Sequence, residues 1–200
     1  MRHNGCCVIL VVCALSFPVL CGFSSAQGPT QTNKAASRAQ VRFLKPSGMK
    51  ITWLIEGPKG KSVFSTVPLE VPGRFNFIQG AIYQLRFTHI QGHEGVTLYP
   101  TLEVVPQQGR GKEFLQHNAA TVAFTDDDFQ QVVKGNFLVK VIYLPDPRFQ
   151  DVAGPGIDHI VSTQLEPGAD PIMEARRRGT ILLVIRMGNR DLEAPNGAGK

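Results

Sequence analysis

The sequence predicts a mainly β protein: an antiparallel β-sandwich with two short helices, preceded by an N-terminal signal segment. Apolar and polar residues alternate in several short segments, which is the period of a half-buried strand. Turn residues separate these segments at short intervals. Helical periodicity occurs in only two places, so the strand and helix alternation of a parallel α/β sheet is missing. Two facing antiparallel sheets would bury the alternating aliphatic faces.

Residues 1–26 have the pattern of a secretory signal peptide. A short basic start precedes an apolar run over residues 6–20, and Ser24-Ser25-Ala26 places small residues where a signal peptidase cuts. We expect cleavage before Gln27, which would leave a mature chain without a stable membrane span. Retention of the segment as an anchor and lipidation at Cys21 are the alternatives.

The cysteines and the charge narrow the class of protein. Cys6, Cys7, Cys13 and Cys21 all precede the predicted cut, so no disulfide framework is expected and the fold must depend on its core. The formal net charge is +5, but the basic residues are spread along the chain without interleaved aromatic residues. Nucleic-acid binding is therefore not expected.

The mature chain is predicted to contain one domain. Residues 27–40 are polar and rich in small side chains, which predicts a disordered linker. The β-sandwich domain is expected over residues 41–190, without an internal repeat or boundary. The chain from Gly188 onward is rich in asparagine and glycine, and residues 191–200 should form a flexible tail.

A hairpin over residues 80–105 is the clearest predicted element. Its two arms alternate, and a polar link over residues 89–95 joins them. Tyr99 falls on the outer face, while Pro100 predicts an edge or a bulge in the second arm. The apolar positions expected on the buried face are Tyr83, Leu85, Phe87, Val96, Leu98, Leu102 and Val104.

Further strands are predicted on both sides of this hairpin. Alternation predicts a strand at residues 51–55 and a second over residues 63–71, which Pro68 should split or confine to an edge. Residues 75–77 are expected to lead into the hairpin, shorter strands are expected at residues 120–124 and 157–161, and a loop is expected at residues 106–111. Residues 137–144 and 180–187 are apolar on both faces, which predicts two strands in the middle of the sandwich.

The two helices have clear start and stop signals. Thr125 is a predicted N-cap followed by three aspartates, and that helix should stop at Gly135. Asp170-Pro171 should begin the second helix, in which Glu174 is placed to pair with Arg178.

Four segments together are similar to a known family: PGRFNFIQGAIYQLRF, LYPTLEV, FTDDDFQQVVKGNFLVKVIYLPDP and EARRRGTILLVIRMGNRDLE. They resemble uncharacterised exported proteins, secreted or in the envelope, of planctomycete-type bacteria. The similarity runs from about Pro72 to Glu193. It implies an exported and envelope-associated protein, and it transfers no catalytic residue or cofactor.

The polar link of the hairpin contains the candidate metal ligands. His89, His93 and Glu94 could supply two imidazoles and a carboxylate to a zinc ion, with His117 as a distant fourth ligand. Gly92 and neighbouring residues favour a loop rather than a helix that would align the imidazoles, so solvent-exposed loop histidines are the competing interpretation.

Other chemical candidates have simpler structural explanations. The three aspartates after Thr125 could bind calcium, but an EF-hand pattern is missing and helix capping accounts for them. Arg176-Arg177-Arg178 could bind an anion, or simply end a helix. No G-x-S-x-G motif is present, and no catalytic residue or cofactor is expected.

Three functions follow from these features. The first is an exported non-enzymatic β-sandwich protein that acts by protein contact or as an envelope component. The second is a module that binds carbohydrate or a small ligand, for which Tyr99 is the candidate contact residue. The third is a metal-dependent hydrolase using the loop from His89 to Glu94. An envelope protein or a polysaccharide is the expected partner.

Overall fold

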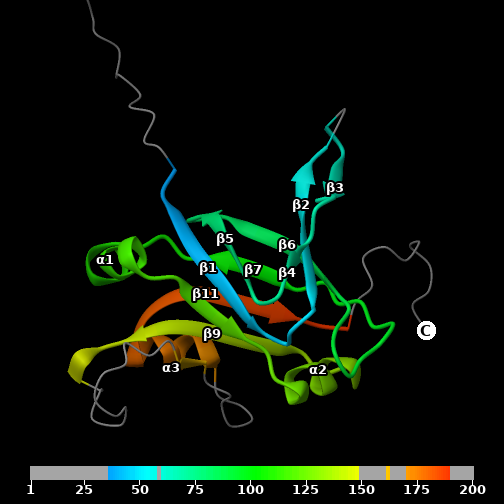
Figure 1. Ribbon diagram of the computed structural model, residues 1–200. Coiled ribbons are helices and arrows are strands. Elements are labelled where there is room, and N and C mark those ends of the chain that lie inside the picture. The colour runs from blue at the N-terminus through cyan, green and yellow to red at the C-terminus, as the bar shows by residue number, and fades with distance from the viewer. Residues whose placement is uncertain (1–35, 58–59, 149–160, 163–169, 190–200) are drawn as a thin grey trace, which may run out of the picture. The chain divides into compact units, whose positions relative to one another are not determined.

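The computed structural model describes residues 36–57, 60–148, 161–162 and 170–189, which belong to the unit Ala35–Lys200 (Figure 1). Several predicted features lie outside the described residues. They are the signal segment 1–26, residues 27–35 of the linker, residues 157–160 and the tail 191–200.

Within the described residues, strands predominate and three helices connect or cover them. The strands are β1 (Arg38–Lys45), β2 (Lys50–Glu56), β3 (Ser62–Phe64), β4 (Leu69–Glu70), β5 (Gly73–Ile78), β6 (Ile82–Thr88), β7 (Thr101–Val104), β8 (Ala120–Ala123), β9 (Leu138–Pro145), β10 (Val161–Ser162) and β11 (Gly179–Met187). The helices are α1 (Gly109–His117), α2 (Asp126–Val133) and α3 (Pro171–Arg178).

The strands form a small and a large sheet. The small sheet has the order β5-β1-β8, and the large one has the order β10-β9-β11-β7-β6-β2-β3, with β4 also paired to β2. Strands β1 and β8 are parallel. The other pairings are antiparallel. The predicted mainly β class is confirmed.

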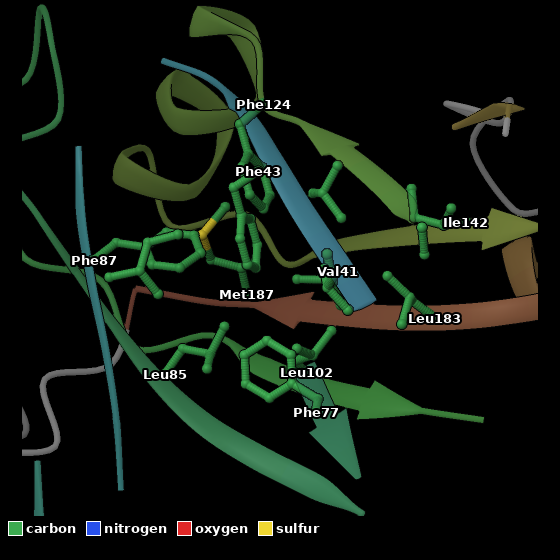
Figure 2. Close-up of a cluster of buried hydrophobic side chains, with 14 of the residues drawn as sticks. Val41, Phe43, Phe77, Leu85, Phe87, Leu102, Phe124, Ile142, Leu183 and Met187 are labelled. Carbon is green, nitrogen blue, oxygen red and sulfur yellow. The ribbon is translucent and has the colours of Figure 1, made fainter. Parts of the chain in front are cut away.

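The main core lies between the two sheets. Ala39, Val41 and Phe43 of β1 are fully buried and belong to the same apolar cluster as side chains of β6, β7 and β11. Figure 2 shows Val41 beside Leu102 and Leu183 of the large sheet. Because alternate residues of a strand face opposite sides, the remaining side chains of β1 point outward.

Strand β1 starts earlier than the sequence predicted. Residues 38–40 were expected in the disordered linker 27–40, but they pair with β5, and Ala39 is fully buried. The alanine at this position continues the apolar alternation of Val41 and Phe43 with a side chain too small to stand out in the sequence.

The predicted hairpin is confirmed, but Pro100 marks neither an edge nor a bulge. Strand β7 lies between β6 and β11, so it is an inner strand. The register between Gln84 and Thr101 continues unchanged to the bridge between Phe87 and Leu98. The Pro100 carbonyl still accepts a hydrogen bond from the Leu85 amide at 2.8 Å. The chain therefore keeps its register across a residue that lacks only its own N–H.

The two long apolar segments form neighbouring strands of one sheet. Strands β9 and β11 are antiparallel partners, and both are buried on their two faces. One face joins the main core. On the other, Tyr143, Ile181 and Val184 pack with Ala175 of α3 in a second cluster. Helix α3 therefore covers the face of β9 and β11 that points away from the main core.

Helices α2 and α3 begin and end as predicted. Thr125 and Asp128 form a reciprocal capping box, and Asp170 caps α3 through the Ile172 amide at 2.9 Å. Glu174 accepts from the Arg178 guanidinium at 2.7 Å. Among the described residues, no helix is long and apolar enough to span a membrane.

Helix α1 is a correction, because two helices were predicted and residues 106–111 were expected to form a loop. Its sequence, GRGKEFLQH, has two glycines and no acidic residue in the first turn. Its N-cap makes no side-chain hydrogen bond. Burial of Leu115 and a hydrogen bond from Arg110 to the Pro145 carbonyl hold the helix instead. Tertiary packing therefore outweighs weak local propensity here.

Candidate functional site

The loop over residues 89–95 is attached to the N-terminus of α2. His93 Nε2 lies 2.8 Å from Asp126 Oδ1, and because a carboxylate only accepts, the imidazole is the donor. The other oxygen of Asp126 accepts from Gln130 at 2.7 Å. The imidazole also lies 5.9 Å from the Phe129 ring. His93 therefore fixes the loop to the helix.

This contact changes the acidity of the aspartate. The hydrogen bond from His93 is the largest cause that lowers the pKa of Asp126 below its ordinary value of 3.8, and the bond from Gln130 adds to it. Both bonds favour the charged carboxylate.

The predicted metal ligands do not converge. His89 is exposed, with Nδ1 3.1 Å from the Thr88 hydroxyl, and Glu94 accepts from the Gly92 amide at 3.3 Å. His89 and Glu94 line one shallow hollow, whereas His93 is bonded to Asp126 and His117 ends α1. In the part of the chain that the structure describes, no three His, Cys, Asp or Glu side chains are placed to hold a metal ion.

The residue proposed for carbohydrate contact is covered. Tyr99 does lie on the outer face of its arm, but it is only 8% exposed. The Phe64 ring of β3 lies 6.0 Å from it, and the Arg86 guanidinium lies 4.5 Å from that Phe64 ring. The prediction of an exposed tyrosine was therefore wrong, because the covering ring comes from a strand distant in sequence.

Two of the three aspartates of α2 have separate roles. Asp126 accepts from His93, whereas Asp128 accepts from the Thr125 amide in the capping box. Asp128 also pairs with Lys140 at 2.5 Å in the core. The capping explanation is confirmed, and these carboxylates are not gathered around a common point.

A surface that the sequence analysis missed lies on the hairpin formed by β2 and β3, which extends away from the main body (Figure 1). Ile55 and Val63 are direct cross-strand partners, and they are 42% and 40% exposed. Trp53 shares the Ile55 face of β2, and its ring lies 4.3 Å from the exposed ring of Phe75. We call Trp53, Ile55, Val63 and Phe75 the hairpin patch.

The hairpin patch was partly visible in the sequence. The alternation that predicted β2 and β3 also placed Trp53, Ile55 and Val63 on the apolar faces of their strands. It could not show that the core ends before Ile55, or that β5 brings Phe75 against Trp53. Exposed apolar side chains that adjoin one another are typical of interaction surfaces.

A cleft of about 470 Å³ lies between α3 and the large sheet. Its apolar side is formed by Ile172, Ile181 and Val184. Its rim includes Glu103 and Arg186, which pair at 2.8 Å. The described residues that line it include no aromatic ring, so it lacks the stacking surface that a carbohydrate site usually has.

These features define a mainly β protein with a projecting apolar hairpin and, among the described residues, without a group of His, Cys, Asp or Glu side chains placed to hold a metal ion. No family model, curated protein or solved structure matches the chain.

Proposed function

We propose that this chain is an exported, non-enzymatic β-sandwich protein that acts in the cell envelope by contact with another protein through the hairpin patch. The observation that carries the proposal is the pairing of Ile55 with Val63 on a hairpin that projects from the body, both about two-fifths exposed.

Sequence and fold give separate support. The signal pattern of residues 1–26 and the resemblance to planctomycete-type exported proteins favour export. The shared core between the small sheet and the large one favours a sandwich. The lack of cysteine after residue 21 suits a domain stabilised by that core alone.

The patch is suited to hydrophobic docking. Fully burying a side chain such as Ile, Val or Phe stabilises by roughly 1.5–3 kcal/mol, so covering the exposed two-fifths would yield about 1 kcal/mol for each. Ring contacts between Trp53, Phe75 and Phe77 hold the base of the patch, which lowers the entropy lost on binding. Strand β3 is also the end strand of its sheet, with one side open to a partner.

Photo-cross-linking tests this contact. A photoreactive phenylalanine analogue at Val63 should capture one envelope protein, and Ile55→Asp in the same chain should abolish the capture. The matched control places the analogue at Ile82, an exposed apolar residue of β6 outside the patch. Capture from Ile82 equal to that from Val63, or capture that survives Ile55→Asp, would reject the patch as the contact surface.

The hydrolase alternative has less support, because His93 Nε2 is bonded to Asp126 and, among the described residues, no three His, Cys, Asp or Glu side chains are placed to hold a metal ion. Titration of the full chain with zinc should leave its melting temperature unchanged. A zinc-dependent rise that disappears in His89→Ala would restore this alternative.

A further inference from the structure

The outer face of the small sheet contains three arginines that form no ion pair with another described residue. Burial of Ala39, Val41 and Phe43 places Arg38 and Arg42 on the opposite face of β1. Arg74 of β5 is the direct cross-strand partner of Arg42. We call Arg38, Arg42 and Arg74 the arginine face.

The Arg42 and Arg74 side chains are held close together. The Gln79 amide donates to the Ser37 carbonyl, so these two residues form a hydrogen-bonded pair of the antiparallel ladder between β1 and β5. Hydrogen-bonded and non-hydrogen-bonded pairs alternate along such a ladder, so the odd-numbered residues of β1 lie in the hydrogen-bonded pairs. Arg42 and Arg74 therefore form a non-hydrogen-bonded pair, whose Cβ atoms are roughly 4.5–5.5 Å apart. Like charges at this position destabilise a sheet, so the fold alone gives no reason for the pair.

Within the described part of the chain, no carboxylate pairs with these cations. The outward positions of the three strands hold no Asp or Glu, and none of the three arginines forms an ion pair within the described part of the chain. The sequence before Glu56 also contains no acidic residue, whereas it contains six lysines and arginines. The residues that precede β1 therefore cannot supply the missing negative charge.

Amide side chains lie between the charges. Gln40 donates to the Asn76 side chain at 3.3 Å, and both line a shallow hollow together with Arg38 and Arg74. Arg38 uses one nitrogen to bond the Asn76 carbonyl at 3.0 Å, which leaves further donors on its guanidinium. Arg38 and Arg42 are four residues apart, or about 13 Å along the strand.

We propose that the arginine face binds an acidic polysaccharide. Guanidinium groups match the geometry of carboxylate and sulfate groups, and the amides between them can bind sugar hydroxyls. A nucleic-acid strand carries a charge about every 3.4 Å and would favour a denser row of cations with stacking rings. The 13 Å interval suits a polymer whose acidic groups are separated by neutral hydroxyl-bearing units. The arginine face adjoins the hairpin patch at β5, because Phe75 of that patch also lines the hollow.

Binding of the full chain to hyaluronate, in which acidic and neutral sugars alternate, and to dextran sulfate tests the proposal, with neutral dextran as the blank. In 50 mM salt the wild type should bind at least one acidic polymer, and Arg42→Glu with Arg74→Glu should weaken that binding at least tenfold. The control pair Lys134→Glu with Arg176→Glu changes the net charge equally at two exposed positions, the C-cap of α2 and a residue of α3, and should alter affinity by less than twofold. If the double glutamate variant unfolds, Arg42→Gln with Arg74→Gln provides the same comparison.

Three results would overturn the assignment. One is the failure of both acidic polymers to bind, and another is equal loss of binding in the control pair. The third is preferential binding to single-stranded poly(dT), or to phosphatidylcholine vesicles containing phosphatidylglycerol, which would indicate a nucleic acid or a membrane instead.

Discussion

Asp128 and Lys140 form an ion pair inside the core, with side chains 1% and 7% exposed. The Lys140 ammonium also donates to the Ala123 carbonyl at 2.9 Å and lies 5.2 Å from the Phe124 ring. The carboxylate accepts from the Thr125 amide at 2.8 Å. One residue pair therefore links the start of α2, the end of β8 and the middle of β9.

Removal of one partner should be costly. Asp128→Ala leaves a buried ammonium without its anion and removes the capping box, so we expect a loss of about 3–5 kcal/mol in the free energy of unfolding. Urea denaturation measures it. The control Asp127→Ala removes an exposed carboxylate from the same helical turn and should cost about 0.3–1 kcal/mol. Equal losses in the two variants would contradict this account of the pair.

The hydrogen bond between His93 and Asp126 leads to a prediction for the pKa of Asp126. His93→Ala removes the main cause of the lowered pKa, so the pKa of Asp126 should rise toward 3.8. Since the folded-state value is depressed, the pair stabilises the protein above about pH 4, and this contribution is lost as the pH falls through the folded-state value. NMR titration of the side-chain carboxyl carbon measures the shift. Glu94→Ala is the control, and an unchanged Asp126 titration in His93→Ala would contradict the assignment.

At the scale of elements, the strand pair β1 and β5 holds Arg42 opposite Arg74. Arg42→Glu replaces a like-charge pair with an opposite-charge pair, so the free energy of unfolding should increase by about 0.2–1 kcal/mol. Thermal unfolding should show a rise of roughly 1–4 °C. Arg38 lies opposite Ile78 instead of a cation, so Arg38→Glu should not raise the free energy of unfolding in this way. A lower melting temperature for Arg42→Glu would contradict the proposed repulsion.

Elements with local signals were predictable from the sequence. The N-caps Thr125 and Asp170, and the Glu174 and Arg178 pair, depend on residues within a few positions of one another. Helix α1 lacks such signals, and only its tertiary contacts show that it forms.

The candidate sites depended on contacts that a sequence does not contain. Tyr99 was assigned to the correct face, yet Phe64 covers it. The position of Trp53 against Phe75 joins residues of β2 and β5, and the Arg42 and Arg74 pair requires the register between β1 and β5. Residue types and alternation predicted the faces, but cross-strand partners determine which faces are accessible and charged.

At the scale of the molecule, one cluster of apolar side chains joins both sheets, as Figure 2 shows for Phe43, Phe77, Phe87 and Met187. The hairpin patch and the arginine face therefore lie on a body with a common core. A body held together in this way presents preformed surfaces, which suits a protein that acts by binding.

Retention in the cell envelope is the most direct test of the central claim, that this is an exported protein held there by contact through the hairpin patch. The measurement is the amount and the intact mass of the chain in washed envelope and soluble fractions of the cells that produce it. We predict that the wild type is retained in the envelope fraction, with the intact mass of a chain that begins at Gln27. The double variant Ile55→Asp with Val63→Asp should be exported equally but found in the soluble fraction. A chain that stays in the cytoplasm, or a variant that is retained as strongly as the wild type, would contradict the claim.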